Sequence, residues 1–205
     1  MDTKERILDS ALTLFSERGY GSVSVADIAG AVGIKAPSLY KHFASKQAIF
    51  DAILDRMQSD YQRKASEFNL DGTDPGSDAG VFSGVSADSL VDMVSGMFGY
   101  FLHDPYASRF RRMLTLEQFS DPRSAEALSS QYFDGPMGYE SVLFGRMLSA
   151  GILKGDGPDL MALEFYSPVF LLLTVCDRQP GREGECRAML ERHVRDFAAI
   201  HGVVR

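Results

Sequence analysis

The segment from Ser24 to Lys46 constrains the fold of this chain more than any other stretch. Ser24 precedes an apolar pattern and Asp27 follows three residues later, close to a capping box, which predicts the start of a helix. Gly33 can adopt the left-handed backbone of a sharp turn after that helix. Pro37 suits the first turn of a second helix, where its missing N–H costs nothing. The segment therefore predicts two short helices joined by a glycine turn.

The second of these helices carries two apolar residues four positions apart, Leu39 and Phe43, which we expect to point inward together. Its Ser, Lys, His and Tyr side chains then lie on the other faces, and these residue types can bond base edges or phosphates. A third helix is expected after Ser45. Lys46 lies at its N-terminus, where free N–H groups and the helix dipole attract an anion. The pattern over 24–43 is typical of a helix-turn-helix that lays its second helix in the major groove of DNA.

The net charge of −7 is distributed unevenly along the chain. Residues 1–64 hold nine Lys/Arg and eight Asp/Glu, a net of +1, whereas the remainder holds 12 and 20, a net of −8. Between Lys35 and Lys46 there are three lysines and no acidic residue. A local basic patch can face phosphates while an acidic body stays clear of them. This distribution argues against an architectural DNA-binding protein without sequence preference, which needs a broad basic surface.

Apolar residues recur at helical spacing along the whole chain, and no period-2 strand pattern stands out, which predicts an all-α fold. A stretch rich in Gly, Asp, Ser and Pro, 69–88, is expected to be a flexible loop. We expect an N-terminal domain over 1–61 and a C-terminal domain over 62–205, joined by a long fourth helix. The expected helices cover about 3–17, 24–32, 37–43, 46–68, 87–102, 105–118, a short stretch after 122, 135–150, 158–176 and 182–200.

Several classes of protein are disfavoured by missing patterns. The longest apolar run, from Val169 to Cys176, is far shorter than the roughly 20 residues of a membrane span. The N-terminus has no secretory-signal pattern, and two cysteines make neither a disulfide framework nor a zinc site. There is no Gly-rich phosphate loop, no G-x-S-x-G elbow and no His-x-x-x-His pair. We therefore expect a cytoplasmic protein that is not an enzyme, without metal, cofactor or membrane partner.

Residues 1 to about 61 resemble the DNA-binding domain of the tetracycline-repressor (TetR) family of transcriptional regulators. The matching residues are Ala11, Phe15, Gly19, Tyr20, Ser24, Ile28, Ala29, Gly33, Leu39, Tyr40, His42, Phe43, Ser45 and Lys46. The resemblance implies a homodimer that places two recognition helices in successive major grooves of a palindromic operator. It implies that Ser24 and Lys46 contact phosphates. The residues on or beside the groove would be Lys35, Ala36, Pro37, Ser38, Tyr40, Lys41 and His42.

The resemblance also implies that the C-terminal domain binds a small-molecule effector, apolar or aromatic in character. The candidate effector-binding residues are Met93, Met97, Phe101, Arg112, Met113, Leu116, Glu117, Tyr132, Phe133, Met137 and Phe144. Met and Phe at helical spacing are usually core, so an ordinary packing role is the alternative for each. The expected function is that of a repressor released from its operator by the effector. There are two alternatives: a transcriptional activator of the same fold, and an architectural DNA-binding protein without effector.

The last two predicted helices each carry an apolar stripe, and two such helices per chain could pair around a two-fold axis as a four-helix interface. The alternative is that both stripes belong to the internal core. The expected interface residues are Leu163, Tyr166, Phe170, Leu173, Met189, Leu190, His193, Val194 and Phe197.

Overall fold

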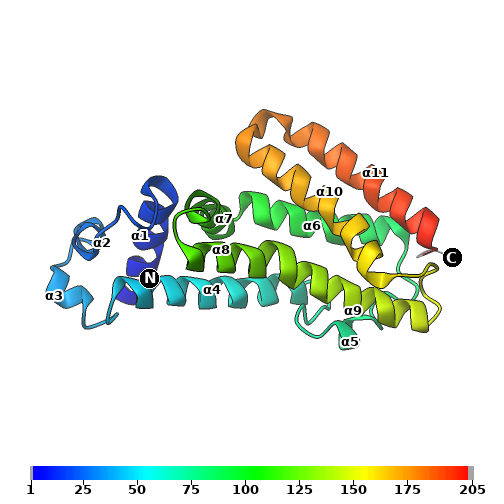
Figure 1. Cartoon of the computed structure of the whole chain (residues 1–205), viewed down its shortest axis with the longest axis horizontal. Coiled ribbons are helices and arrows are strands. Elements are labelled where there is room, and N and C mark those ends of the chain that lie inside the picture. Colours follow the sequence, from blue (N-terminus) through cyan, green and yellow to red (C-terminus); the bar gives the residue numbers. More distant parts are fainter. Residues whose placement is uncertain (1, 203–205) are drawn as a thin grey trace. The chain divides into compact units, whose positions relative to one another are not determined.

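The computed structural model describes residues 2–202, and every regular element in that part of the chain is a helix (Figure 1). The all-α prediction is therefore confirmed. The elements are α1 (Thr3–Arg18), α2 (Val25–Val32), α3 (Ala36–Leu39), α4 (Lys46–Ser66), α5 (Pro75–Asp78), α6 (Ala87–His103), α7 (Pro105–Glu117), α8 (Pro122–Ser129), the π-helix η1 (Ser130–Asp134), α9 (Gly135–Ser149), α10 (Pro158–Arg178), the short 3-10 helix η2 (Pro180–Arg182) and α11 (Glu183–His201).

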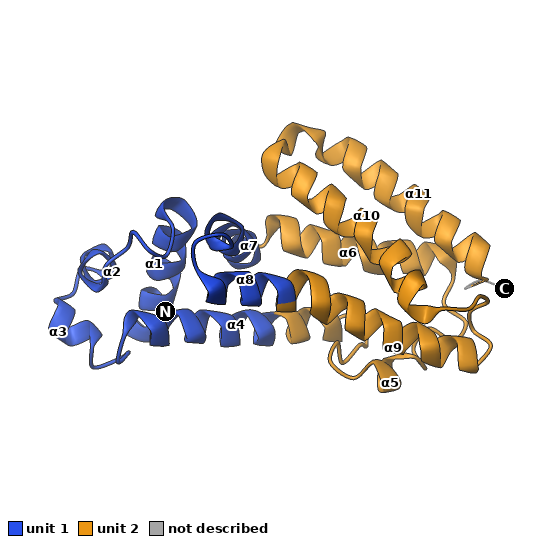
Figure 2. Cartoon of the chain, viewed as in Figure 1, with its two compact units in different colours: residues 1–60, 105–129 blue, residues 61–104, 130–205 orange. Residues whose placement is uncertain are grey.

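The chain divides into two compact units (Figure 2). Unit 1 comprises Met1–Asp60 and Pro105–Ser129, and unit 2 comprises Tyr61–Asp104 and Ser130–Arg205. The first division falls at the end of the domain expected over 1–61. The structure differs from this expectation because α7 and α8 belong to unit 1, although they follow α5 and α6 of unit 2 in sequence.

The core of unit 1 joins α7 to the N-terminal helices, and α1 packs against α7. The residues without solvent exposure in this core are Ile7, Ala11, Leu12, Phe15, Ile28, Leu39, Ile49, Ile53, Ala107, Phe110, Met113 and Leu114. Each helix contributes apolar side chains at spacings of three and four, so one face of each is buried.

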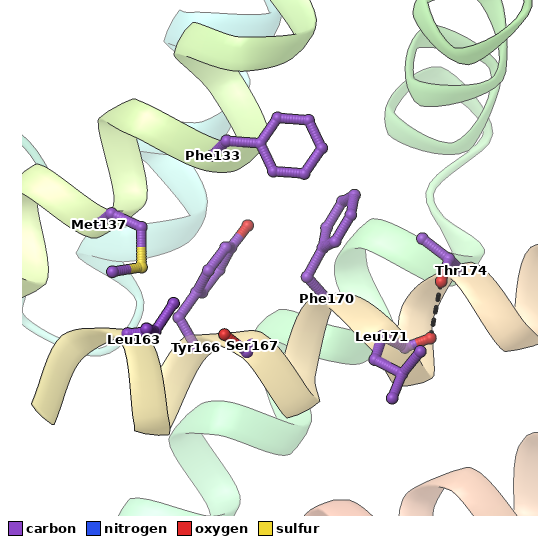
Figure 3. Close-up of a pocket in the computed structure, with 8 residues that line it drawn as sticks. All are labelled: Phe133, Met137, Leu163, Tyr166, Ser167, Phe170, Leu171 and Thr174. Atoms are coloured by element: carbon purple, nitrogen blue, oxygen red, sulfur yellow. Dashed lines mark hydrogen bonds between the residues drawn. The ribbon is translucent and has the colours of Figure 1, made fainter. Parts of the chain in front are cut away.

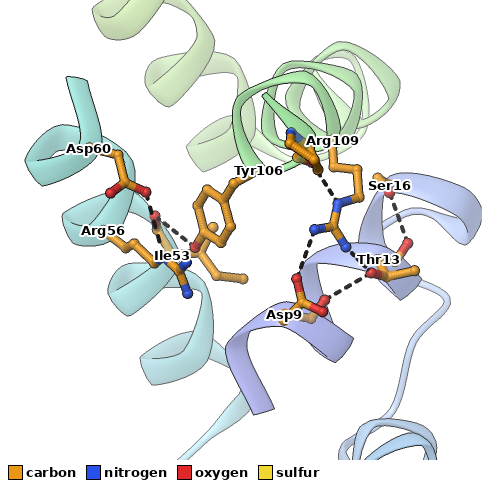
Figure 4. A network of polar contacts seen from close by, with 9 residues as sticks. Asp9, Thr13, Ser16, Ile53, Arg56, Asp60, Tyr106 and Arg109 are labelled. Atoms are coloured by element: carbon orange, nitrogen blue, oxygen red, sulfur yellow. Dashed lines mark hydrogen bonds and ion pairs between the residues drawn. The ribbon is translucent and has the colours of Figure 1, made fainter. Parts of the chain in front are cut away.

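Polar contacts fasten α7 to its neighbours at its N-terminal end (Figure 4). The Arg109 guanidinium donates to the Asp9 carboxylate at 2.7 Å and to the Thr13 hydroxyl, both on α1. The Tyr106 hydroxyl donates to the Ile53 carbonyl of α4 at 3.4 Å, and the Arg56 guanidinium lies 4.4 Å from the centre of the Tyr106 ring. These contacts hold α7 between α1 and α4 in addition to the apolar packing.

Unit 2 is built around α6, α9, α10 and α11, with α10 in contact with the other three (Figure 1). Its most buried apolar residues include Phe98, Met147, Ala162, Leu173, Cys176, Cys186, Leu190, Val194 and Phe197. By length and composition α10 could cross a membrane, contrary to the expectation from the longest apolar run. One face of α10 packs into the core of unit 2, and 28% of its apolar stretch is buried.

The stretch 69–88 is more ordered than the expected flexible loop. The Asp74 carboxylate caps α5 by accepting from the N–H groups of Gly76 and Ser77. Asp78 is buried, and its carboxylate accepts from the N–H groups of Asp71 at 2.7 Å and Gly72 at 2.9 Å. It also accepts from the Tyr139 hydroxyl of α9. The three donors on Asp78 and the burial of Ala79 and Phe82 in the core of unit 2 together fix the segment, and this explains the difference from the sequence prediction.

Asp78→Ala should destabilise the protein by about 2–3 kcal/mol, because it leaves buried donors without an acceptor. Denaturant unfolding of the full chain measures this. Asp92→Ala, which removes an exposed carboxylate from α6, is the matched control and should stay within about 0.5 kcal/mol of the parent. A loss at Asp78 no larger than that of the control would show that the carboxylate does not anchor the segment.

Candidate functional site

Both ends of α2 are fixed by specific contacts. The Ser24 N–H donates to Asp27 Oδ2 at 2.8 Å and the Asp27 N–H donates to Ser24 Oγ at 3.1 Å, which is the expected capping box in full. These bonds with Ser24 hold the pKa of Asp27 below its usual value. At the other end Gly33 has a left-handed backbone with φ of 77°, and the Arg6 guanidinium donates to the Val32 carbonyl at 2.6 Å. The turn into α3 is therefore set by backbone geometry and capping.

The segment predicted to contact DNA, Lys35 to His42, lies on the surface of unit 1 and is called the reading segment below. Leu39 and Phe43 are buried as expected. The remaining predicted groove residues are exposed or half-buried, namely Lys35, Ala36, Pro37, Ser38, Tyr40, Lys41 and His42. The Tyr40 side chain is 52% exposed, so its ring and hydroxyl group are accessible to a partner. The regular helix α3 covers only four residues, shorter than the sequence suggested, and turns continue it to Phe43.

Lys46 has a different environment from the one its predicted phosphate contact suggests. Its ammonium donates to the carbonyls of Tyr20 at 2.8 Å and Val23 at 2.9 Å and lies 4.2 Å from the centre of the Tyr20 ring. Partial burial lowers the pKa of Lys46. An ammonium has three donors, and these bonds use two of them. Lys46 therefore ties down the loop that leads to Ser24, and any phosphate contact would come in addition.

Unit 2 contains an apolar pocket of about 420 Å³ between α10 and the start of α9 (Figure 3). Its volume lies within the usual range for small-molecule sites, roughly 300–1,000 Å³. The Phe133 and Phe170 rings meet edge to face at 4.8 Å between centroids. The lining residues are Phe133, Met137, Leu163, Tyr166, Ser167, Phe170, Leu171 and Thr174.

A widened helical turn, η1, shapes one wall of this pocket. Pro136 has no N–H to give to the carbonyl of Tyr132, four residues earlier, and the Tyr166 hydroxyl donates to that carbonyl at 3.0 Å instead. Gly135 is required at its position, because an added Cβ would lie 2.1 Å from the carbonyl oxygen of Ser130. Such π turns occur often at functional sites. Here the turn places Phe133 in the pocket wall.

The structure divides the expected effector-binding residues between the two units. Of the set, the pocket is lined by Phe133 and Met137, whereas Phe101, Tyr132, Phe144, Met93 and Met97 lie elsewhere in unit 2. The remaining four, all on α7, belong to unit 1: Arg112 and Leu116 are exposed, Met113 is buried in its core, and Glu117 lies against Gly19.

The structure places the expected dimer residues in different environments. Leu173, Leu190, Val194 and Phe197 are buried in the core of unit 2, so they have no surface to offer a partner. His193 is half-buried and its ring nitrogen is 2.8 Å from the Phe165 carbonyl. Leu163 and Met189 are each 50% exposed. Leu163, Tyr166 and Phe170 line the pocket, which the sequence had not indicated, because α10 is apolar on nearly every face.

Residues 7–53 match the family model for bacterial regulatory proteins of the tetR family. The HTH-type negative transcriptional regulator IcaR of the biofilm operon icaADBC, from Staphylococcus aureus (strain Newman), is 52% identical over 48 residues. That match covers 23% of this chain and 26% of IcaR, so the chain spans about a quarter of this relative's length. The N-terminal domain belongs to the TetR family.

Solved structures extend the likeness of fold beyond the TetR domain. SmeT, the repressor of the Stenotrophomonas maltophilia multidrug efflux pump SmeDEF, has a TM-score of 0.67 at 18% identity and covers 100% of this chain and 94% of its own. A putative transcriptional regulator from Saccharomonospora viridis in complex with choline has a TM-score of 0.62 at 19% identity, covering 96% and 95%. At these identities the likeness concerns the fold.

In the TetR domain, Lys46→Met should lower the stability of the protein by about 1–2 kcal/mol, because two loop carbonyls lose their donor. Denaturant unfolding measures this. The matched control is Lys41→Met, which removes an exposed ammonium from the reading segment and should leave stability unchanged. If the Lys46 variant is as stable as the parent, the loop does not depend on the ammonium.

Gly135→Ala should destabilise the protein by about 1–3 kcal/mol, because the added methyl group collides with the backbone of η1. Thermal unfolding gives the stability, and near-ultraviolet circular dichroism reports the rearrangement of Tyr132 and Phe133. Gly138→Ala on the same helix meets no atom within 4 Å and should be neutral or slightly stabilising. Equal behaviour of the two variants would contradict the requirement for glycine at 135.

Proposed function

We propose that this protein is a ligand-responsive transcriptional repressor that binds a palindromic operator as a homodimer and is released by a small-molecule effector. The observation that carries the proposal is the exposed basic and aromatic segment from Lys35 to His42, held by the buried Leu39 and Phe43. Exposed Tyr, Lys and His side chains on a short helix after a tight turn suit contact with DNA.

The relatives support the regulatory part of the proposal. IcaR is named a negative transcriptional regulator and SmeT a repressor. Structures of fold neighbours exist with small molecules, triclosan for SmeT and choline for the Saccharomonospora viridis regulator. We propose the same kind of regulation for this chain, namely repression that a small molecule relieves. We also propose that the protein acts in the cytoplasm, where such regulators bind DNA.

The proposed interface between two copies lies on the outward faces of α10 and α11. Large apolar side chains are half or more exposed there, and exposed apolar patches of this kind mark interaction surfaces. The residues are Leu160, Leu163, Leu171 and Met189, and because Leu163 and Leu171 also line the pocket, the pocket would open onto this interface. Two helices from each copy would form a four-helix interface around a two-fold axis.

A dimer allows a ligand to control DNA binding through geometry. The two half-sites of an operator lie about one helical turn apart, ~34 Å, so a change in the separation of the reading segments breaks one set of contacts. The helix α4 is continuous from Lys46 in unit 1 to Ser66 in unit 2, and it provides one of the covalent connections between the units. To shift such an equilibrium fully, the ligand must favour one state by roughly 5.5 kcal/mol.

Tyr40→Ala should weaken binding to the best DNA site by roughly ten-fold, about 1.4 kcal/mol, because an exposed aromatic hydroxyl is lost from the reading segment. The site comes from selection among random duplexes, and fluorescence anisotropy measures the affinity. Phe119→Ala removes the most exposed aromatic side chain of unit 1 from the turn after α7 and serves as control.

The selected site should also show two inverted half-sites. Unchanged affinity of the folded Tyr40 variant, or selection that yields no preferred sequence, would contradict the proposed function. A preferred sequence without inverted symmetry would contradict the dimer.

A further inference from the structure

Glu140, on α9, has a carboxyl group in an unfavourable position. Its Oε2 atom is buried and has no hydrogen-bond partner among residues 2–202. Burial raises the pKa of Glu140 well above its usual value. Buried polar groups are nearly always paired, and one buried oxygen atom without a partner costs about 1–3 kcal/mol of folding free energy. A bound molecule could supply the partner that the fold does not provide for this oxygen atom.

The surroundings of Glu140 are negative. Burial, together with the charges of Glu140 and Asp78, raises the pKa of Tyr61 to about 12. The pKa of Tyr139 is raised by burial, by its hydrogen bond to Asp78 and by the same negative charges. Asp78 already accepts three hydrogen bonds, so its charge is held in place by the fold. Of the two carboxyl groups, that of Glu140 has an oxygen atom that can still accept a hydrogen bond.

Aromatic faces connect this carboxyl group to the pocket. The Tyr61 and Phe101 rings stack with centroids 6.2 Å apart, and Phe101 meets Tyr132 edge to face at 5.9 Å. Tyr132 in turn lies 6.3 Å from Phe170, a pocket residue shown in Figure 3. Aromatic rings have negative faces that attract cations, most strongly where water is excluded.

The pocket and the buried carboxyl group also share one face of α9. Met137 lines the pocket and Glu140 follows three residues later, so the two side chains are neighbours on the helix surface. Glu140 is not among the residues that line the pocket, and about one helical turn separates it from Met137.

We propose that unit 2 binds a lipophilic organic monocation, whose ammonium group pairs with the carboxylate of Glu140 and whose apolar part lies against Met137 and the aromatic rings. This inference rests on the proposed function only in naming the class of effector. The cation would ionise the buried carboxyl group, since an opposite charge nearby favours the charged form. Binding would then release a proton from Glu140 to solvent.

The test uses two molecules of the same shape and different charge, phenyltrimethylammonium and its carbon isostere tert-butylbenzene. Calorimetry on the purified full chain, without DNA, measures the affinity of each. The cation should bind at least ten-fold tighter than the isostere. Its binding heat should vary with the ionisation enthalpy of the buffer, which reports the released proton.

Glu140→Gln keeps the shape of the side chain and removes the charge. It should weaken cation binding at least ten-fold and leave the isostere unaffected, while Asp92→Asn, which removes an exposed charge in the same unit, changes neither. Equal affinity for the two molecules, no binding of the cation at millimolar concentration, or an unaltered cation affinity in the Gln variant would overturn the inference.

The proton measurement uses the unaltered chain, so it remains decisive if the Gln variant does not fold. Tighter binding of the neutral molecule would show that the pocket selects apolar surface and not charge, and would also overturn the inference. Failure to bind DNA would contradict the proposed function alone, because the calorimetry contains no DNA.

Discussion

The burial of two side chains, Leu39 and Phe43, determines whether this protein has a reading surface at all. A regular helix of four residues is far below the length at which isolated helices are stable in water, about 12–15 residues. The orientation of α3 therefore comes from its anchors in the core of unit 1 and from the capped turn at Gly33. Because the anchors face inward, the residues between them can be chosen for contact with DNA with little effect on folding.

That core does not consist of the N-terminal residues alone. Phe110 and Met113 of α7 are fully buried in it, and Arg109 bonds α7 to α1. The segment that supports the reading helix thus returns to unit 1 only after the chain has passed through α6 of unit 2. Three connections join the units, namely α4, the junction before Pro105 and the junction between Ser129 and Ser130, and a change in unit 2 can act on unit 1 through each of them.

The sequence predicted the helices well, because caps and breakers act locally. The capping boxes and turns at Ser24, Gly33 and Ser45 are in place, and the bounds of the long helices agree within about two residues. It could not assign apolar stripes to partners, since a stripe has the same pattern whether it faces the core or a second chain. Leu190, Val194 and Phe197 were expected at the interface and are buried in the core of unit 2. The sequence also could not show that Lys46 donates to carbonyls about two dozen residues away, because that contact depends on the folded loop.

The order of 69–88 and the role of Glu140 escaped prediction for a related reason: both depend on where single carboxylates lie in space. Asp78 and Glu140 both carry a carboxyl group near the same tyrosine, but the fold supplies donors to Asp78 and leaves Oε2 of Glu140 without a partner. Asp78 therefore stabilises unit 2, whereas Glu140 costs it free energy. Tyr61, which both carboxylates influence, lies on α4 at the first residue of unit 2. A cation that ionises Glu140 and pairs with it would change the electrostatics at that point of α4, the helix that leads to the reading segment.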